Sequence, residues 1–418
     1  MKILWIVNTI FPIPSKELGL PEPVVGGWMY GLAKQVSETL GVELAVATTS
    51  VFTEVKKIDK HGIKYYILPC NNNTKYEPKL ENYWTEVCNE FQPDVVHIHG
   101  TEFAHGLACL RKLPNIKYVV SIQGLVGVYA KYYYAGIGFN DIIRSVTLRD
   151  FVRMDMIWQQ KIKFQRRGKL ESEYLKKANH VIGRTQWDKS HVMIFNPRVS
   201  YHFCNESLRN RFYESEKWSL GNCNKHTIFL SQAGYPIKGL HQIIKSVNLL
   251  KDEFPQIKIR IAGQNIFKDR TFFEKLKMSG YAKYIKSLLN KYNLNSYFEF
   301  TGQLNESGII KEFLNSNIFI CPSSIENSPN SIGEAQILGV PCVASFVGGI
   351  PDMIKHDVDG LIYRFEEYEM LASHIKNVFL DDILTNRLSS NSIKTAERRH
   401  NVYRNCERTV EIYKQILI

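Results

Sequence analysis

Two glutamates at a fixed spacing are the first residues of this chain that indicate a chemistry. Seven residues separate Glu326 from Glu334, and the segment between them is rich in serine, asparagine and proline. The backbone amides of Ser328, Asn330 and Ser331 lie where the start of a helix would present N–H donors to an anion. Amide donors suit a phosphate and carboxylates suit sugar hydroxyls, so the pattern indicates an anionic, polyhydroxylated ligand.

The element that must position the two glutamates is a strand–loop–helix–strand unit. The apolar run Ile318–Cys321 predicts a buried strand, and Pro322–Asn330 predicts a polar loop after it. A helix is expected from about Ser331 to the break at Gly339-Val340-Pro341. The short strand Cys342–Ser345 follows. This order is typical of the βαβ unit of a parallel sheet.

A purely structural role for Glu334 remains open at this point. The tetrapeptide from Ser331 to Glu334 fits the capping box S/T-x-x-E, in which the glutamate closes the helix end. Glu326 has no such local partner, although a solvated glutamate in a loop is common. The local pattern therefore does not by itself separate a ligand site from a helix cap.

Size and composition favour a two-domain globular protein in a reducing compartment. The chain has 418 residues, of which 44% are hydrophobic and 22% charged. No apolar run approaches the roughly 20 residues that span a bilayer. The start of the chain has a short apolar run that fits a first strand better than a signal peptide. The eight cysteines are scattered without a CxxC pair, so we expect reduced thiols, no structural zinc and a cytoplasmic location.

The charge balance narrows the class of partner. With 53 basic and 41 acidic residues, the formal net charge is +12. Such an excess suits nucleic acid, an anionic membrane surface or phosphorylated substrates. No helix-turn-helix, zinc-finger or RNA-binding signature is present, so we expect no nucleic acid partner.

The first half of the chain alternates short apolar strands with helices. A proline-rich loop that contains Pro12, Pro14, Pro21 and Pro23 follows the first strand, and Gly26-Gly27 then opens a helix expected over Trp28–Leu40. Strands are expected at Lys2–Asn8, Val42–Thr48, Ile63–Leu68, Asp94–Gly100, Tyr118–Gly124 and Ala178–Thr185.

The second half repeats this alternation after an irregular linker over Tyr201–Lys225. We expect strands at Thr227–Ser231, Lys258–Ala262 and Tyr297–Thr301, and helices at Leu240–Lys251 and Glu306–Leu314. Gly263 and Gly302 mark two strand exits, and ligands of open α/β sheets bind at that edge. The expected domains are residues 1–205 and 225–399, with a last helix at about 400–418 that packs back on the first.

The segment from Asp141 to Lys169 has a different character. Basic residues outnumber acidic ones there, large apolar residues are interleaved with them, and the aromatic cluster Tyr129–Tyr134 precedes it. A basic amphipathic helix beside aromatics suggests contact with an anionic membrane surface. The alternative is an ordinary surface helix that packs its apolar face inward, and the two interpretations are compatible.

With these elements placed, the sequence resembles the family 4 retaining glycosyltransferases (glycosyl transferases group 1). The resemblance covers most of the chain and is strongest from Ser231 to Phe365. It is carried by Glu326-x7-Glu334, Lys238-Gly239, Phe300-Thr-Gly302, Asp94-Val-Val-His-Ile-His99, Gly26-Gly27, the run LGVP and the pattern GG-x-P-D. The family has the GT-B fold, an α/β architecture of two Rossmann-like domains whose parallel sheets face each other across a cleft.

The resemblance implies a nucleotide-diphosphate sugar donor held mainly by the C-terminal domain. Lys238 would pair with the diphosphate as a point charge, Glu326 would bind hydroxyls of the donor sugar near the reacting carbon, and Glu334 would bind the ribose. We assign catalytic roles to Lys238 and Glu326. The further donor-binding residues are Gly26, Gly27, Gln123, Gly263, Gly302, Asn327, Ser328, Asn330 and Ser331.

Two departures from the family pattern stand out. The family usually has an arginine five or six residues before the lysine, where this chain has Ala233 and Gln232. One diphosphate contact is then missing, or another cation such as Arg184 replaces it. Gln123 stands where the family often has a histidine that contacts the donor sugar, and an amide carries no charge. Of His97 and His99, at least one is expected to be structural.

The expected function is sugar transfer with retention, from the nucleotide sugar to a glycan or polyprenyl-linked acceptor in cell-envelope or exopolysaccharide assembly. No cofactor and no metal are expected, and an anionic membrane surface is a candidate partner at the inner face of the cell membrane. Two alternatives stay open: a GT-B relative with other chemistry, such as a nucleotide-sugar epimerase or a phosphorylase, and a non-catalytic binder of nucleotide sugars or polyanions. The sequence does not identify the sugar, the base or the acceptor.

Overall fold

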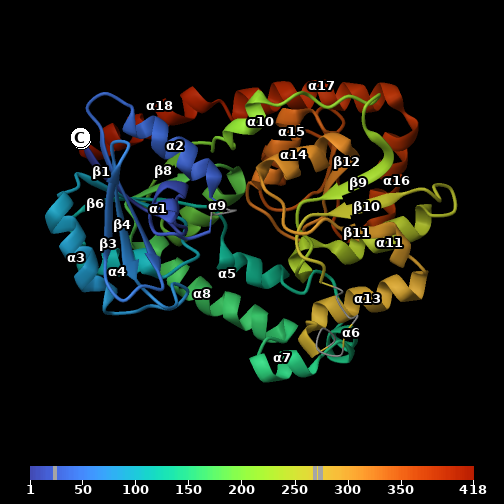
Figure 1. Ribbon diagram of the computed structural model, residues 1–418, viewed down its shortest axis with the longest axis horizontal. Coiled ribbons are helices and arrows are strands. Elements are labelled where there is room, and N and C mark those ends of the chain that lie inside the picture. Colours follow the sequence, from blue (N-terminus) through green and yellow to red (C-terminus); the bar gives the residue numbers. More distant parts are fainter. Residues whose placement is uncertain (22–25, 267–270, 272–275) are drawn as a thin grey trace. The chain divides into compact units, whose positions relative to one another are not determined.

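The computed structural model describes residues 1–21, 26–266, 271 and 276–418, so Pro23 of the predicted proline-rich loop lies outside the described residues. The chain divides into two compact units (Figure 1). The first unit comprises Met1–Val128, Phe164–Asn210 and Arg399–Ile418, and the second comprises Tyr129–Lys163 and Arg211–Arg398. The segment Tyr129–Lys163, which lay inside the predicted first domain, therefore groups with the second unit.

The first unit is built on an eight-stranded sheet with the order β3-β4-β2-β1-β5-β6-β7-β8. Every pairing is parallel except that of β3 with β4. The strands are β1 Lys2–Ile6, β2 Glu43–Ser50, β3 Lys56–Lys60, β4 Ile63–Pro69, β5 Val95–His99, β6 Lys117–Ser121, β7 His180–Gly183 and β8 Ser200–Phe203.

Helices cover both faces of this sheet, and strand β1 shows how the two faces are filled. Side chains alternate along a strand, so Leu4 and Ile6 join the core under α3 and α4, while Ile3 and Trp5 join the core under α2 and α18. The helices assigned wholly or partly to this unit are α1 Pro12–Glu17, α2 Gly27–Ser37, α3 Leu80–Phe91, α4 His105–Lys112, α5 Val126–Tyr129, α8 Ile157–Lys177, α9 Gln186–Phe195, α10 Asn210–Glu214 and α18 Val402–Leu417.

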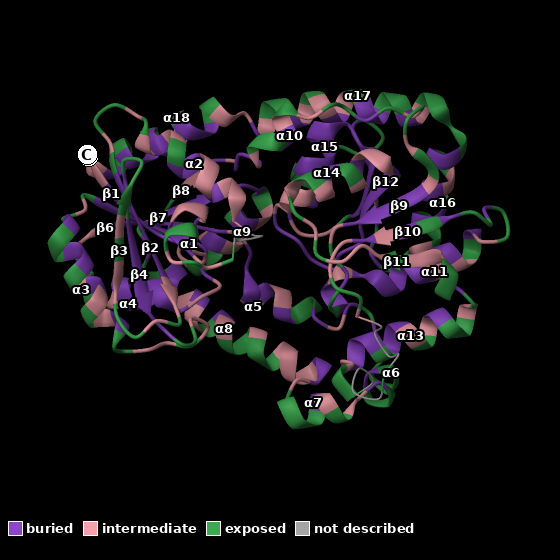
Figure 2. Cartoon of the chain, viewed as in Figure 1, coloured by how far each residue is buried: buried purple, intermediate pink, exposed green. Residues whose placement is uncertain are grey.

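The second unit is built on a six-stranded parallel sheet with the order β11-β10-β9-β12-β13-β14. Its strands are β9 Asn224–Leu230, β10 Lys258–Ile261, β11 Phe298–Phe300, β12 Ser316–Cys321, β13 Cys342–Ser345 and β14 Leu361–Tyr363. Strand β12 is buried along its whole length, as a central parallel strand with both faces covered must be (Figure 2).

The helices of the second unit connect these strands, follow the last of them, or come from the segment Tyr129–Lys163. They are η1 Ala130–Tyr132, α6 Phe139–Arg144, α7 Leu148–Arg153, η2 Pro236–Lys238, α11 Leu240–Leu250, α13 Gly280–Tyr292, η3 Asn295–Tyr297, α14 Glu306–Asn315, α15 Asn330–Leu338, η4 Ile350–Asp352, α16 Tyr368–Leu380 and α17 Asp382–Arg399. In the described part of the chain, no helix is long and apolar enough to cross a membrane.

The strands predicted from apolar runs are confirmed, with shifts of up to three residues at their ends. The predicted linker is wrong at both ends, because Ser200–Phe203 forms strand β8 beside β7 and β9 already begins at Asn224. These segments were missed because their residues are largely polar and only partly buried. The antiparallel edge strand β3, which carries three lysines, was missed for the same reason.

The single amphipathic helix expected over 141–169 is also wrong. The region forms α6, α7 and the start of α8. Helix α7 starts anew because the hydroxyl of Thr147 accepts a hydrogen bond from the amide of Asp150, and it ends where Met154 adopts a left-handed conformation with φ 50°.

Candidate functional site

Most of the predicted donor-binding residues belong to the second unit, and we call them the donor-side residues: Lys238, Gly263, Gly302, Glu326, Asn327, Ser328, Asn330, Ser331 and Glu334. They lie at one edge of the second sheet, around the point where its strand order reverses. From β9 the chain builds outward through β10 and β11, and the later strands β12, β13 and β14 lie on the opposite side of β9. Ligands of open α/β sheets bind outside the carboxyl ends of the strands at such a switch point. Lys238 follows β9 and Glu326 follows β12, so the two residues flank this point.

Lys238 and Glu326 form a largely buried ion pair. The Nζ of Lys238 lies 2.6 Å from Oε1 of Glu326, and the two side chains are 16% and 9% exposed. The hydroxyl of Ser323 donates to the same oxygen at 2.8 Å. Burial by itself would lower the pKa of Lys238, but the charge of Glu326 and its hydrogen bond to the lysine outweigh burial and raise that pKa. The lysine is therefore held as a cation.

Close backbone approach explains why a glycine follows Lys238. Gly239 has φ 69°, and a Cβ on it would lie 1.7 Å from the carbonyl oxygen of Pro322. The amide of Ser324 also donates to the carbonyl of Ile237 at 2.8 Å. The turn after β9 is thereby held against the loop after β12, and this contact brings Lys238 to Glu326.

A second glycine fixes the backbone at Glu326 itself. The amide of Gly349 donates to the carbonyl of Glu326 at 3.0 Å. A Cβ on Gly348, which has φ 51°, would lie 1.8 Å from that same oxygen. The GG-x-P-D pattern therefore supports the loop that carries Glu326.

Helix α15 places Glu334 differently from a capping box. The helix begins at Asn330 with Pro329 as its N-cap, and no side chain caps it. Ser331 is thus inside the helix, and Glu334, its fifth residue, is buried with 7% exposure. The capping interpretation of Glu334 is wrong because the helix starts earlier than the tetrapeptide requires.

The loop before α15 offers its polar groups at different depths. Glu326 and Asn327 are buried, whereas Ser328, Asn330 and Ser331 are half-buried. The amides at the start of α15 point away from the helix body and carry its positive dipole end. This arrangement is suited to an anion.

Gly263 and Gly302 lie at the exits of the neighbouring strands β10 and β11. Both adopt left-handed conformations, with φ 112° and 80°, and the amide of Gly263 donates to the carbonyl of Gly302 at 3.0 Å. A Cβ at either position would meet no atom within 4 Å. Glycine is needed here for the backbone conformation and not for a packing contact within the protein.

The other three predicted residues, Gly26, Gly27 and Gln123, belong to the first unit. Gly26 precedes α2 with φ 82°, and a Cβ on it would lie 2.5 Å from the methyl group of Thr9. At Gly27 a Cβ would approach the side chain of Arg209 to 3.2 Å. The amide of Gln123, after β6, contacts the sulfur of Met29 at 3.7 Å.

The two histidines of β5 differ in their surroundings. Both ring nitrogens of His97 have partners, the hydroxyl groups of Tyr413 at 2.6 Å and of Ser121 at 2.5 Å. Burial lowers the pKa of His97 to about 3, so it is neutral and structural, as expected for at least one of the pair. His99, at the carboxyl end of β5, is 2% exposed and neither ring nitrogen has a hydrogen-bond partner.

Glu102, just after β5, is a candidate functional residue of the first unit that the sequence analysis did not single out. The amide of Gly124 donates to its carboxylate at 3.2 Å, and burial raises the pKa of that carboxyl group. A Cβ on Gly100 would lie 2.2 Å from its other oxygen. Glu102 follows β5 at the point where the strand order of the first sheet reverses, between β1 and β5. This position could have indicated a site, but a single glutamate after a strand is too common in sequences to predict one.

Arg184, proposed above as a replacement for the missing arginine, is already committed within the first unit. Its guanidinium pairs with Glu206, and both side chains are almost fully buried. It also lies 5.5 Å from the ring centre of Trp28. At the family's arginine positions, Ala233 is buried and Gln232 is exposed. No group of three His, Cys, Asp or Glu side chains suited to a metal ion occurs among the residues described.

The family comparison falls on the second unit. Residues 213–395 match the model of "Glycosyl transferases group 1". The Bacillus subtilis protein YtcC is 25% identical over 196 residues, which are 46% of this chain and 46% of YtcC. The Escherichia coli UDP-Gal:alpha-D-GlcNAc-diphosphoundecaprenol alpha-1,3-galactosyltransferase is 25% identical over 103 residues, 25% of this chain and 26% of that enzyme. The chain spans about half the length, or less, of these curated relatives.

Similarity to solved structures extends over the whole chain. Sucrose-phosphate synthase from Thermosynechococcus elongatus superimposes with a TM-score of 0.72 at 16% identity, covering 100% of this chain and 99% of that one. HepE from Anabaena in complex with UDP-glucose gives a TM-score of 0.68 at 16% identity, covering 99% and 100%. At this identity the likeness concerns the fold, which is GT-B as predicted. The family match over 213–395 confirms the resemblance to the glycosyl transferases group 1 for that part of the chain, and the fold of the whole chain is the one that the resemblance implied.

Proposed function

We propose that this protein is a retaining glycosyltransferase. It moves a sugar from a nucleotide-diphosphate donor to a glycan or polyprenyl-linked acceptor in cell-envelope or exopolysaccharide assembly. The observation that carries the proposal is the Lys238–Glu326 pair at the switch point of the second sheet, inside the region that matches the family. The pair places one fixed cation and one carboxylate where a phosphorylated sugar can meet both.

The proposed chemistry is a front-face displacement at the anomeric carbon. The acceptor hydroxyl attacks that carbon on the face from which the diphosphate oxygen departs, the bond to that oxygen breaks, and the hydroxyl proton passes to the departing diphosphate. Lys238 and the amides at the start of α15 stabilise the departing diphosphate by preorganised charge. Glu326 orients hydroxyls of the donor sugar, and Glu334 binds the ribose. No metal ion is needed in this scheme, so chelation with EDTA is expected to leave the transfer rate unchanged.

Known proteins support the choice of donor and acceptor. The neighbour HepE was solved with UDP-glucose, and the Escherichia coli relative is named for a diphosphoundecaprenol acceptor. The formal charge of +12 suits a phosphorylated substrate and an anionic surface. We propose that the enzyme acts in the cytoplasm at the inner face of the cell membrane.

The first experiment identifies the donor and tests the site residues. A thermal-shift screen across nucleotide sugars should raise the melting temperature for the true donor, because a ligand that binds only the folded state stabilises it. Transfer of the radiolabelled sugar to a membrane lipid extract is then compared for Glu326→Gln, Glu334→Gln and Lys238→Ala. Each is expected to lower kcat/KM by about 100-fold or more.

Glu397→Gln, at an exposed position of α17, is the matched control and should transfer normally. If all three site variants keep near-native activity, the site assignment is wrong. Isomerised sugar formed without an acceptor would instead indicate an epimerase. Donor binding without turnover against any acceptor extract would indicate a non-catalytic binder.

A further inference from the structure

Helix α7 is amphipathic in the inverse sense to an ordinary surface helix. Its apolar side chains Leu148, Phe151 and Val152, and Met154 just after it, are 63%, 65%, 73% and 61% exposed. The side chain that it buries is a carboxylate, because Asp150 is only 1% exposed. Surface helices normally turn their apolar stripe toward the core. The apolar side chains of α7 are therefore not covered by the protein's own core, and a contact with another partner would explain their exposure.

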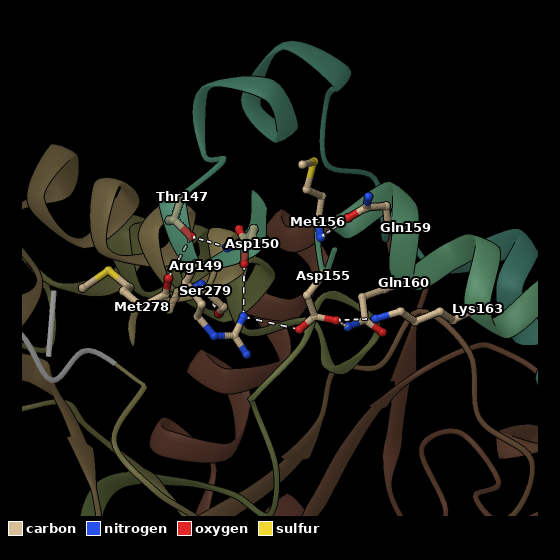
Figure 3. Close-up of polar contacts among 11 residues, drawn as sticks. Thr147, Arg149, Asp150, Asp155, Met156, Gln159, Gln160, Lys163, Met278 and Ser279 are labelled. Carbon is tan, nitrogen blue, oxygen red and sulfur yellow. Dashed lines mark hydrogen bonds and ion pairs between the residues drawn. The ribbon is translucent and has the colours of Figure 1, made fainter. Parts of the chain in front are cut away.

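Polar contacts hold α7 in this orientation (Figure 3). The hydroxyl of Thr147 donates to the carbonyl of Met278 at 2.9 Å and accepts from the amide of Asp150 at 3.2 Å. Nη1 of Arg149 lies 3.1 Å from Oδ1 of Asp150 and 3.3 Å from Oδ2 of Asp155. The polar side chains of the helix are thus used as anchors, and the apolar ones are left outside.

Close packing on α13 fixes α7 further. A Cβ on Gly280, the first residue of α13, would lie 2.6 Å from a carboxylate oxygen of Asp150 and 3.1 Å from the carbonyl oxygen of Ser145. The ammonium group of Lys283 donates to the carbonyl of Val146 at 3.1 Å. The carboxylate of Asp150 is therefore balanced by Arg149 and by the positive end of α13.

Helix α6, which three residues separate from α7, also exposes apolar side chains. It buries Ile142 but exposes Phe139 and Ile143, which are 64% and 50% exposed. We call the exposed apolar side chains of the two helices the hairpin face: Phe139, Ile143, Leu148, Phe151, Val152 and Met154. Six large apolar side chains are thus exposed on two consecutive short helices, and exposed apolar groups of this kind mark an interaction site.

The charges beside the hairpin face select the kind of partner. Arg144 and Arg153 are exposed, and neither has an ion-pair partner among the described residues. Asp150 and Asp155 are already paired with Arg149, which leaves Asp141 as the exposed acid of the two helices. Apolar side chains beside unpaired arginines suit the interface of an anionic bilayer. A second copy of the chain would bring like charges together.

We propose that the α6–α7 hairpin docks on an anionic lipid bilayer and inserts the hairpin face at the headgroup boundary. The protein lies on the membrane by this face and does not span it. This is a narrower site than the long amphipathic helix expected from the sequence, and it lies in the second unit, with the donor-side residues.

The chain that leads into the hairpin is tied to the donor-side residues. The hydroxyl of Ser324 donates to the carbonyl of Tyr132 at 3.1 Å, and Nε2 of His241 donates to the carbonyl of Ala135 at 2.8 Å. Ser324 is two residues from Glu326, and His241 is three residues from Lys238. The bilayer contact thereby deepens the proposed function, since it would hold the donor-side unit close to a lipid-linked acceptor.

Vesicle flotation tests the proposal without requiring sugar transfer. The full-length protein is mixed with vesicles of phosphatidylglycerol and phosphatidylcholine in equal parts, or of phosphatidylcholine alone. The wild type should float with the anionic vesicles and much less with the neutral ones. The double variant Phe151→Ser with Val152→Ser should lower vesicle partitioning about tenfold or more. Arg144→Gln with Arg153→Gln should lower it about tenfold, and added salt should mimic this loss.

The matched control is Leu380→Ser with Ile383→Ser, which removes two exposed apolar side chains elsewhere in the second unit. It should float as the wild type does. A wild type that stays unbound to the anionic vesicles, hairpin variants that float normally, or a control that loses binding equally would overturn the proposal. The proposal would also be overturned if the wild type ran as a dimer in gel filtration and the Phe151 and Val152 changes made it a monomer. A second copy of the chain would then cover the hairpin face.

The outcome is independent of that for the proposed function. All of these variants should keep the donor-induced rise in melting temperature, because the substituted side chains are exposed and outside the donor-side residues. Loss of flotation with donor binding retained supports the hairpin, whereas loss of donor binding in the wild type would count against the glycosyltransferase and leave the flotation result standing.

Discussion

At the scale of residues, the site depends on two charges that neutralise each other in the free protein. Lys238 and Glu326 are 88 positions apart in the chain and meet only because β9 and β12 are neighbours. Both are mostly removed from water, where an unpaired charge is costly. A diphosphate would give Lys238 a second anionic partner, and this is the physical basis of its proposed role.

Removing only the lysine is expected to destabilise the fold as well as the site. Lys238→Met leaves the carboxylate of Glu326 buried with the hydroxyl of Ser323 as its donor. We expect the free energy of unfolding to fall by about 3 kcal/mol. The double variant Lys238→Met with Glu326→Gln should lose less than this, because no buried charge remains. Urea unfolding of the two single variants and the double variant measures this.

The same cycle separates stability from catalysis. If Lys238→Met alone is as stable as the wild type, the ion pair contributes little to the free energy of unfolding, and Glu326 is better solvated than its burial indicates. If the double variant regains stability yet stays inactive, the loss of transfer belongs to the site and not to misfolding.

At the scale of elements, two glycines set the distance between the turn after β9 and the loop after β12. Gly239 approaches the carbonyl of Pro322, and Gly348 approaches that of Glu326. Both also have left-handed backbones. A side chain at either position would push the loops apart, so these glycines position the charge pair without touching a ligand.

Gly239→Ala is expected to cost about 3 kcal/mol or more of stability, from backbone strain together with the clash on Pro322. Gly302→Ala is the control for strain alone, since it has a left-handed φ of 80° but open space around its Cβ position. It should cost only about 1 kcal/mol. Thermal unfolding of both variants measures the difference, and equal losses would mean that the close approach contributes nothing.

At the scale of the whole molecule, neither compact unit is a continuous stretch of chain. The first unit is completed by Arg399–Ile418, and the second by Tyr129–Lys163. Helix α18 packs its apolar side on the core around Trp5 and Val46. The hydroxyl of Tyr413 bonds both to Nε1 of Trp5 at 2.8 Å and to Nδ1 of His97 at 2.6 Å. The end of the chain thus secures its first strand.

Tyr413→Phe tests this link. The change leaves the indole N–H of Trp5 and Nδ1 of His97 buried without partners, so the first unit should lose about 3 kcal/mol of stability. Tyr403→Phe on the same helix is the control, because Tyr403 is 78% exposed, and it should change stability by less than about 0.5 kcal/mol. Urea unfolding followed by tryptophan fluorescence compares them. A Tyr413 variant as stable as the control would contradict the role assigned to α18.

Much of the fold was predictable because buried parallel strands consist of short runs of apolar residues, which can be recognised in the sequence. Ile318–Cys321 and Val95–Ile98 show this pattern, and both are fully buried. The edge strand β3 was not predictable, since its lysines and aspartate face water on an outer strand. The break between α6 and α7 was missed because a cap such as Thr147 competes with a continuing helix, and local pattern does not decide between them.

The sequence by itself determined the alternation of strands and helices, the glycine turns after them, and the motifs that carry the family resemblance, because these depend on neighbours in the chain. Only the tertiary structure decided what depends on distant residues: that Lys238 pairs with Glu326, that Glu334 is not a helix cap, and that His97 is satisfied while His99 is not. It also decided that α7 buries its acid and exposes its apolar side chains, because only packing on α13 sets which face of a short helix points outward.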